Sequence, residues 1–153
     1  MILLKHNELA LEFVQIDGFA TLMNMLSKEC IKSTQIAYNV VCALWILSYH
    51  KFALKYFAPE DFSNNVIAQI IKILDYFNKE NIVRIILMVL DNLKNDSNCL
   101  ELMSLCDCAQ VVIKLQKKPW VDQDICPSTE LDKNGVKQIG LLDKLFDFFA
   151  ENA

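Results

Sequence analysis

Residues that interrupt helices are scarce in this chain. Its 153 residues include three glycines and three prolines, while apolar residues make up 54%. That apolar content excludes a disordered tail or a flexible linker, because so many side chains have to leave water. The shortage of turn residues argues against a fold of many β-strands, which needs a turn roughly every ten residues. The composition therefore predicts a helix-rich domain, and the length fits one domain.

Long apolar runs and basic clusters are also missing. The longest unbroken apolar run, Val40–Leu47, has eight residues, whereas a membrane-spanning helix needs about 20. The net charge is −4, and no basic cluster is longer than Lys117-Lys118, which is too little to displace the counterions of a nucleic acid. We therefore predict neither direct membrane insertion nor binding to nucleic acid.

The start of the chain lacks the residue order of a signal peptide. Met1–His6 reads instead as a helix already under way, which favours a segment of a longer protein. Six cysteines stand at positions 30, 42, 99, 106, 108 and 126, and they fit a reducing cytosol better than a disulfide framework. Cys42 lies inside the apolar run, so we expect it to pack in the core and to be unreactive.

Signals for catalysis or metal binding are weak. No glycine precedes Lys-Ser or Lys-Thr, so no phosphate-binding loop is predicted. His50, at a helix end, is interpreted as a satisfied or solvated side chain rather than a general base. Cys106 and Cys108 are too closely spaced for a zinc pair, and Asp122 and Asp124 lie in a polar loop without the burial that a catalytic pair needs. We predict no catalytic residue, no cofactor and no metal.

Apolar residues recur with the period of an α-helix along most of the chain, which predicts an all-α fold. Four segments carry the pattern: 36–47, 66–77, 82–93 and 142–149. Some helix ends are also marked. Asp17-Gly18 separates two helices, a short helix around 52–57 ends before Pro59, and Asp96 or Ser97 is placed to cap the helix that follows.

The helices also repeat. Val40–Leu47 aligns with Ile86–Leu93 at an offset of 46, and a second register relates segments that begin at Ala20, Ala68 and Ala109. A period in the forties is typical of armadillo or HEAT repeats. We therefore predict an armadillo/HEAT-like right-handed superhelix of about three repeats over residues 1–117. An acidic loop that contains proline and glycine follows at 118–138, and a C-terminal amphipathic helix of the same domain at 139–153.

Trp45 is the most suggestive single residue. The segment Ala43–Ser48 resembles the third helix of armadillo repeats in nuclear-import receptors, where a Trp and an Asn four residues later bind an extended basic peptide. Here Tyr49 stands in place of that asparagine, and in the next repeat Asn95 is present but Asp91 replaces the Trp. An armadillo-type peptide-binding adaptor is therefore the alternative hypothesis, with packing as the simpler interpretation of Trp45.

Read in order, blocks of residues 10–126 resemble one family, the regulatory H subunits of the vacuolar-type proton-pumping ATPases (V-ATPases). The blocks are Phe13–Gly18, Leu26–Cys30, Gln35 with Tyr38, Leu44–Ser48, Asn65–Ile67, Lys79–Leu87, Asn92-Leu93 and Trp120–Ile125. The strongest are Glu80–Leu87 and the Trp-x-Asp-x-Asp-Ile segment. The resemblance places them in the second half of the family's N-terminal helical-repeat domain, and it ends at Pro127.

The resemblance implies a regulatory or scaffold subunit of the V1 sector that is not an enzyme. It would bind the peripheral stalk, made of the E and G subunits, and couple ATP hydrolysis to proton transport from the cytosolic face of vacuolar or endosomal membranes. In the family a separate C-terminal domain silences ATP hydrolysis, and this chain is too short to include it. The partner-binding residues predicted here are Trp45, Arg84, Asp91 and Asn95. We also expect residues 1–14 and 141–149 to expose apolar surface or to bury it against another chain.

Overall fold

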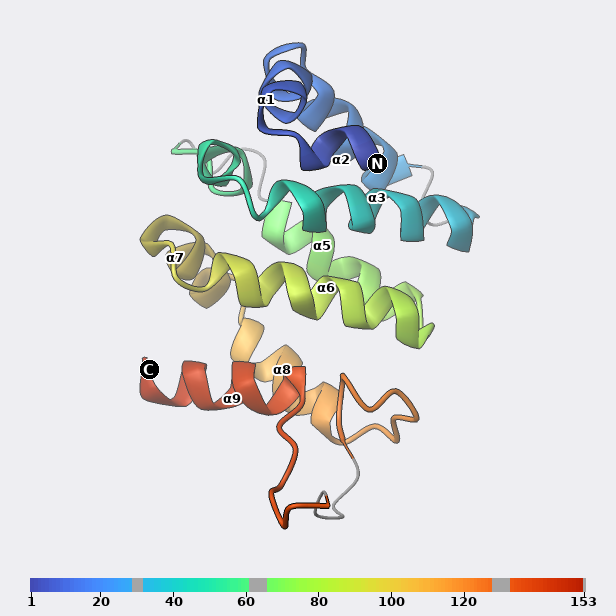
Figure 1. Ribbon diagram of the computed structural model, residues 1–153, viewed down its shortest axis with the longest axis vertical. Coiled ribbons are helices and arrows are strands. Elements are labelled where there is room, and N and C mark those ends of the chain that lie inside the picture. The colour runs from blue at the N-terminus through green and yellow to red at the C-terminus, as the bar shows by residue number, and fades with distance from the viewer. Residues whose placement is uncertain (29–31, 61–65, 128–132, 153) are drawn as a thin grey trace.

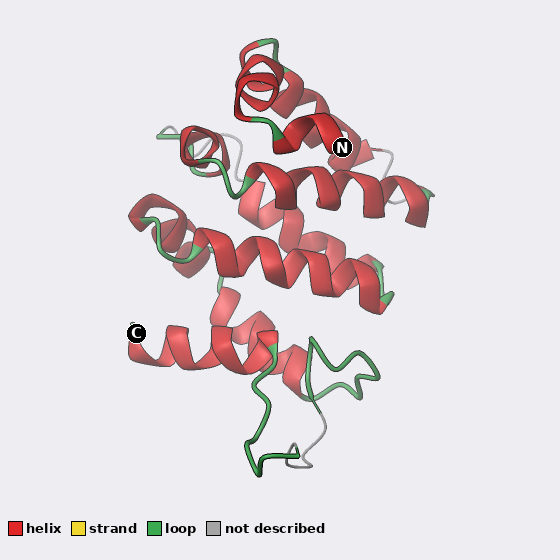
Figure 2. Cartoon of the chain, in the orientation of Figure 1, coloured by secondary structure: helices red, strands yellow, loops and turns green. Residues whose placement is uncertain are grey.

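In the computed structural model, every regular element that is described is a helix, as Figure 2 shows. The description covers residues 1–28, 32–60, 66–127 and 133–152. The prediction of an all-α fold is thereby confirmed. The α-helices are α1 (Asn7–Gln15), α2 (Gly18–Lys28), α3 (Thr34–Leu47), α4 (Leu54–Phe57), α5 (Val66–Tyr76), α6 (Glu80–Leu93), α7 (Ser97–Leu105), α8 (Cys108–Gln116) and α9 (Leu141–Glu151), with short 3-10 helices η1 (Ile2–Lys5) and η3 (Lys51–Ala53).

The helices form successive layers along the long axis of the molecule (Figure 1). Three helices, α3, α6 and α9, lie side by side across the front, in that order, and both neighbouring pairs are in contact. Behind them, α2 packs against α3, α5 against α6 and α8 against α9. The α3 and α6 helices each have 14 residues, and their bounds are offset by the 46 residues that the sequence comparison indicates.

One continuous core joins these layers. Buried apolar residues run from Leu4 in η1 to Leu145 in α9. The α6 helix contributes most clearly: Ile82, Ile86, Leu87 and Leu93 have no exposed side-chain surface. Because this helix is covered by α3 on one side and by α9 on the other, its apolar stripe is wide, as the sequence pattern predicts for a helix between two neighbours.

Helix boundaries follow local chemistry. Asp17 adopts a left-handed backbone with φ of 60°, and α2 begins at the next residue. A Cβ on Gly18 would lie 2.4 Å from the carbonyl oxygen of Phe13, so the tight corner between α1 and α2 requires glycine there. The carboxylate of Asp96 accepts a hydrogen bond from the Cys99 amide. Of the two predicted caps for α7, it is therefore Asp96 that occupies the N-cap position.

The expected exposure of apolar surface is found in the first fourteen residues, and only in part at 141–149. In the first fourteen residues, Ile2 and Leu3 are 76% and 64% exposed. At the other end, Leu142 and Leu145 are fully buried, and Phe146 is 39% exposed. The sequence pattern shows that α9 is amphipathic but does not show what covers it. Its apolar stripe faces α6 and α8, so most of that surface is already used inside the chain.

Candidate partner-binding surface

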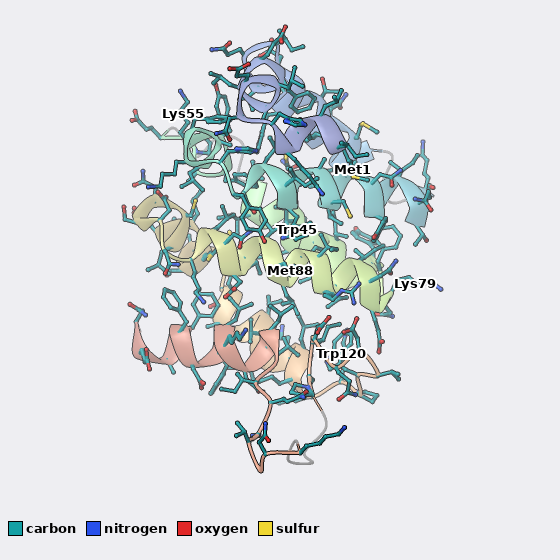
Figure 3. The ribbon with its side chains drawn as sticks, in the orientation of Figure 1. Met1, Trp45, Lys55, Lys79, Met88 and Trp120 are labelled. Atoms are coloured by element: carbon teal, nitrogen blue, oxygen red, sulfur yellow. The ribbon has the colours of Figure 1, made fainter. Side chains whose placement is uncertain are left out.

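Three of the predicted partner-binding residues belong to α3 and α6, two of the three helices that lie side by side across the front of the molecule (Figure 1). We call this side the front face. Figure 3 shows Trp45 on α3 and Met88 on α6 near its middle. Trp45 and Met88 are both half-buried and pack against the core. Arg84 and Asp91 also lie on α6, whereas Asn95 lies two residues beyond the end of that helix, in the turn before α7.

Trp45 is anchored by packing rather than by a polar contact. Its ring meets the ring of Tyr49 edge to face, with centroids 5.8 Å apart. The indole Nε1 is shielded from solvent and has no hydrogen-bond partner. Tyr49 is 61% exposed, so the two rings together present an aromatic patch whose outer edge reaches solvent. Aromatic rings of this kind are enriched at protein interfaces.

Arg84 is already engaged within the chain. Its guanidinium donates to the carboxylate of Asp122 at 3.0 Å and lies 3.5 Å from that of Asp124. The Asp122 side chain is 13% exposed and the Asp124 side chain 74%. The stronger contact is therefore the shielded one, and Asp124 still presents most of its surface to solvent.

Glu80, one turn earlier on α6, completes this attachment. Its two carboxylate oxygens accept hydrogen bonds from the backbone amides of Val121, at 2.7 Å, and Asp122, at 3.0 Å. Within the longer predicted loop 118–138, from here on we call only residues Trp120–Ile125 the acidic loop. Its amides bond to Glu80 and its carboxylates to Arg84, so the N-terminal turns of α6 satisfy both kinds of polar group.

The acidic loop is also fixed at its two ends. The Trp120 indole N–H donates to the Leu115 carbonyl at 2.7 Å, and Ile125 is fully buried. Beyond it, the amides of Leu141 and Leu142 donate to the carbonyls of Asp124 and Ile125. The loop thereby joins α8, α6 and the start of α9. Trp120 thus anchors the loop to the end of α8.

This contact brings together the two strongest sequence motifs, Glu80–Leu87 and Trp120–Ile125. Sequence reasoning singled out both but assigned no role to Glu80, and it placed Arg84 as a partner contact. The available signal was an acid and an arginine at i and i+4 on one helix, together with a loop that carries two aspartates. Nothing in a single sequence shows that segments about 40 residues apart meet.

Asp91 and Lys94 form an ion pair at the other end of α6. The Lys94 ammonium also lies 5.3 Å from the ring centroid of Phe148 in α9, a favourable cation–π distance. The Asp91 carboxylate is 29% exposed. Near it, the Asn92 side chain donates to the Ser48 hydroxyl at 2.8 Å, which connects α6 to the end of α3. Asn95 is exposed.

Burial affects the acidity of three thiols, those of Cys42, Cys99 and Cys108. Burial raises the pKa of Cys42, while a hydrogen bond with Tyr38 and the charge of Arg84 act in the opposite direction. The same hydrogen bond raises the pKa of Tyr38. Burial also raises the pKa of Cys99 and of Cys108 to about 12. Cys42 is 7% exposed, which confirms its predicted place in the core. Cys30 lies outside the described residues.

His50 is satisfied inside the fold. It is 9% exposed, and its Nε2 lies 2.7 Å from the carbonyl oxygen of Leu4.

In the described part of the chain, no three His, Cys, Asp or Glu side chains gather closely enough to hold a metal ion. Over the same residues, no single helix has the length and apolar character to cross a membrane, although the bent pair α1 and α2 passes that test jointly.

Comparison with known proteins gives a consistent result. The family model for the H subunit of V-ATPases matches residues 1–131. The chain is 27% identical over 134 residues to a probable V-type proton ATPase H subunit of Oryza sativa subsp. japonica, and 29% identical over 136 residues to a V-type proton ATPase H subunit of Dictyostelium discoideum. These alignments cover 87% and 88% of this chain, but 28% and 30% of the two relatives. The chain thus spans less than a third of their length.

Proposed function

Because this chain belongs to the family of V-ATPase H subunits, we propose that it is a non-catalytic regulatory or scaffold subunit of the V1 sector. In this role it binds the peripheral stalk formed by the E and G subunits and helps to couple ATP hydrolysis to proton transport. It then works in the cytoplasm, at the cytosolic face of vacuolar or endosomal membranes. The observation that carries the proposal is the family match over residues 1–131.

We further propose that the layers described above are about three armadillo/HEAT-like repeats of a right-handed superhelix. The equal lengths of α3 and α6 and their 46-residue offset support this assignment. Each repeat then supplies one helix to the front face. A stack of rigid helices with aromatic and charged side chains along one side suits a partner that is itself a long helical structure.

The front face is our proposed contact for the stalk, with Trp45, Asp91 and Asn95 as predicted contact residues. Arg84 is part of the same prediction, although its guanidinium is held by the acidic loop. Tyr49 extends the set, because it is exposed beside Trp45. Exposed aromatic residues that lose water on binding contribute much of the energy of an interface.

A pull-down of this chain with an E–G heterodimer tests the proposal. We expect the chain to bind, and Tyr49→Ala to weaken binding about tenfold, since truncation of an interface aromatic costs on the order of 1–2 kcal/mol. Tyr76→Ala is the matched control, because Tyr76 is equally exposed, 60% against 61%, but lies on α5. Absence of binding by the folded chain, checked by circular dichroism, would reject the proposal.

The alternative function, an armadillo-type peptide-binding adaptor, predicts a different partner. It requires the Trp45 side chain to be open to solvent, beside a groove that receives an extended basic peptide. Trp45 is instead half-buried and packs against the core, and Tyr49 stands in place of the asparagine of the Trp–Asn pair. Titration of Trp45 fluorescence with a lysine-rich peptide distinguishes the two functions: a saturable change would favour the adaptor.

A further inference from the structure

The segment that leads into α9 carries the single Asn-Gly pair of the chain, Asn134-Gly135. Residues 133–139 are all exposed and lie outside any helix, and this segment projects away from the helix layers (Figure 1). The pair therefore meets water on the surface of the folded chain. Asparagine is among the thermally labile residues of proteins. The residue that follows it governs how fast it reacts, because the backbone nitrogen of that residue is the attacking group.

The backbone at Gly135 leaves this nitrogen accessible. Gly135 has φ of +74°, a left-handed conformation that suits glycine. A Cβ built on it would meet no atom of the described residues within 4 Å, so no side chain among them crowds this position. Over the same residues, the Gly135 amide makes no hydrogen bond. The nitrogen is therefore neither held by a partner nor covered by packing.

We propose that Asn134 is a site of spontaneous deamidation in the folded protein, with water as the co-reactant. The Gly135 backbone nitrogen attacks Cγ, the side-chain carbonyl carbon of Asn134. A new N–Cγ bond forms, and the bond from Cγ to the side-chain nitrogen breaks. That nitrogen leaves as ammonia together with the proton of the Gly135 amide. The product is a cyclic succinimide that joins the two residues.

Water then opens the succinimide at either of its carbonyl carbons. Attack at Cγ gives an aspartate with the ordinary backbone. Attack at the main-chain carbonyl carbon gives an isoaspartate, whose backbone runs through the former side chain and is longer by a methylene group. Either route consumes water and releases ammonia overall, and each adds a carboxylate. The net charge, −4 in the printed sequence, therefore becomes more negative by one unit.

The fold accommodates this product. The start of α9 is held by hydrogen bonds from its first backbone amides to carbonyl oxygens of the acidic loop, and these bonds do not involve residues 133–139. In the sequence the new carboxylate lies between Lys133 and Lys137, both of which are exposed, and nearby cations favour a negative charge. Modification therefore changes the charge and the local backbone but leaves the last helix layer folded.

Incubation of the folded chain at mildly alkaline pH and physiological temperature tests the proposal. Peptide mass spectrometry follows the gain in mass when the side-chain NH2 is replaced by OH. Protein isoaspartyl methyltransferase with labelled S-adenosylmethionine detects the isoaspartyl form. Asn78 is the internal control, because it is also exposed and outside a helix but precedes a lysine. We expect Asn134 to react at least about tenfold faster than Asn78, which corresponds to a barrier about 1.4 kcal/mol lower.

A peptide and two variants separate the chemistry from the fold. A peptide with the sequence of residues 133–138 gives the unhindered rate, and we expect the folded chain to react within about fivefold of it, since the segment is exposed. Gly135→Ala places a methyl group beside the attacking nitrogen and should slow the reaction about tenfold. Asn134→Asp carries the charge of the product and should leave the urea midpoint of the chain unchanged.

Equal rates at Asn134 and Asn78 would overturn the proposal, because the Asn-Gly pair would then give no advantage. A folded chain that reacts more than about tenfold slower than the peptide would overturn it as well, since the fold would then protect the site. A lower urea midpoint for Asn134→Asp would contradict the accommodation of the product. These measurements do not depend on binding to an E–G heterodimer, so they are decided independently of the proposed function.

Discussion

Arg84 is the only arginine in the chain, and its position explains why one guanidinium was needed there. It bridges two aspartates of the acidic loop at 3.0 Å and 3.5 Å. A guanidinium can donate to both carboxylates at once, whereas a lysine acts as a single point charge. Because the Arg84 side chain is 33% exposed, solvent screens part of this attraction.

We predict that Arg84→Ala lowers the free energy of unfolding by about 1 kcal/mol, because it leaves the half-buried Asp122 without its cation. Arg84→Lys should recover part of the loss. Urea denaturation followed by circular dichroism measures both effects. Lys72→Ala serves as the control, because Lys72 is exposed on α5 and its removal should change little. An unchanged midpoint for Arg84→Ala would mean that Glu80, Trp120 and the buried Ile125 hold the loop without the guanidinium.

The buried thiols predict a loss of stability in alkali. Folding raises the pKa of Cys99 and of Cys108 from 9.0 to about 12. Below pH 9 the thiols are protonated in both the folded and the unfolded chain, so they do not make the free energy of unfolding depend on pH. Between pH 9 and 12 the unfolded chain releases protons that the folded chain retains, and stability therefore falls as pH rises.

We expect the urea midpoint to fall across this pH range and Cys108→Ala to reduce the slope. In native alkylation at pH 8 followed by mass spectrometry, Cys99 and Cys108 should react much more slowly than the partly exposed Cys126. Rapid labelling of Cys108 in the folded chain would contradict this, since it would require the α7–α8 corner to open readily.

At the scale of the elements, the position of α9 depends on the backbone at Gly140. A Cβ on this residue would lie 2.5 Å from the Ile125 carbonyl oxygen and 2.5 Å from Pro127 Cδ. The same close approach allows the amide of Leu142 to donate to that carbonyl at 3.2 Å. Glycine is therefore required here for space rather than for its backbone angles, since its φ is −82°.

Gly140→Ala should destabilise the chain by about 1–3 kcal/mol, the usual cost of overpacking. It should also increase hydrogen exchange at the start of α9. Gly135→Ala separates the two possible causes: Gly135 has φ of +74° but open space around it, so alanine there costs about 1–2 kcal/mol of backbone strain and leaves α9 in place. Equal hydrogen-exchange protection of α9 in both variants would show that Ile125 and Pro127 shift to make room for the new Cβ at no cost in free energy.

Sequence periodicity was enough to predict the helices but not the contacts between them. The helical spacing correctly predicted helices at 36–47 and 82–93, because apolar residues at i, i+3 and i+4 report which side of a helix is buried. It could not report which neighbour buries that side, so the burial of Leu142 and Leu145 by other helices of the same chain was not predicted. Likewise, the place of Asn95 beyond α6 depends on where the helix ends, which spacing defines poorly.

At the scale of the whole molecule, one core runs through every layer from Leu4 to Leu145. Contacts are nevertheless local: α3 touches α6, and α6 touches α9. In such a stack, stability depends on the coupling between neighbouring layers. The acidic loop strengthens the coupling between the last two layers, because it forms hydrogen bonds with α6, α8 and the start of α9.

Two tryptophans report the two halves of the stack separately. Trp45 lies on α3 and Trp120 in the acidic loop. Leu145→Ala removes a fully buried side chain of α9 and should lower stability by about 2–5 kcal/mol, whereas Phe146→Ala, at a residue 39% exposed, should cost less.

In Trp45→Phe and Trp120→Phe backgrounds, we expect Leu145→Ala to shift the urea transition of the remaining tryptophan equally. A continuous core transmits the loss from α9 through α6 to α3, so the layers unfold together. A shift seen only by Trp120 would show that the final layer unfolds alone and that α3 and α6 form the stable unit.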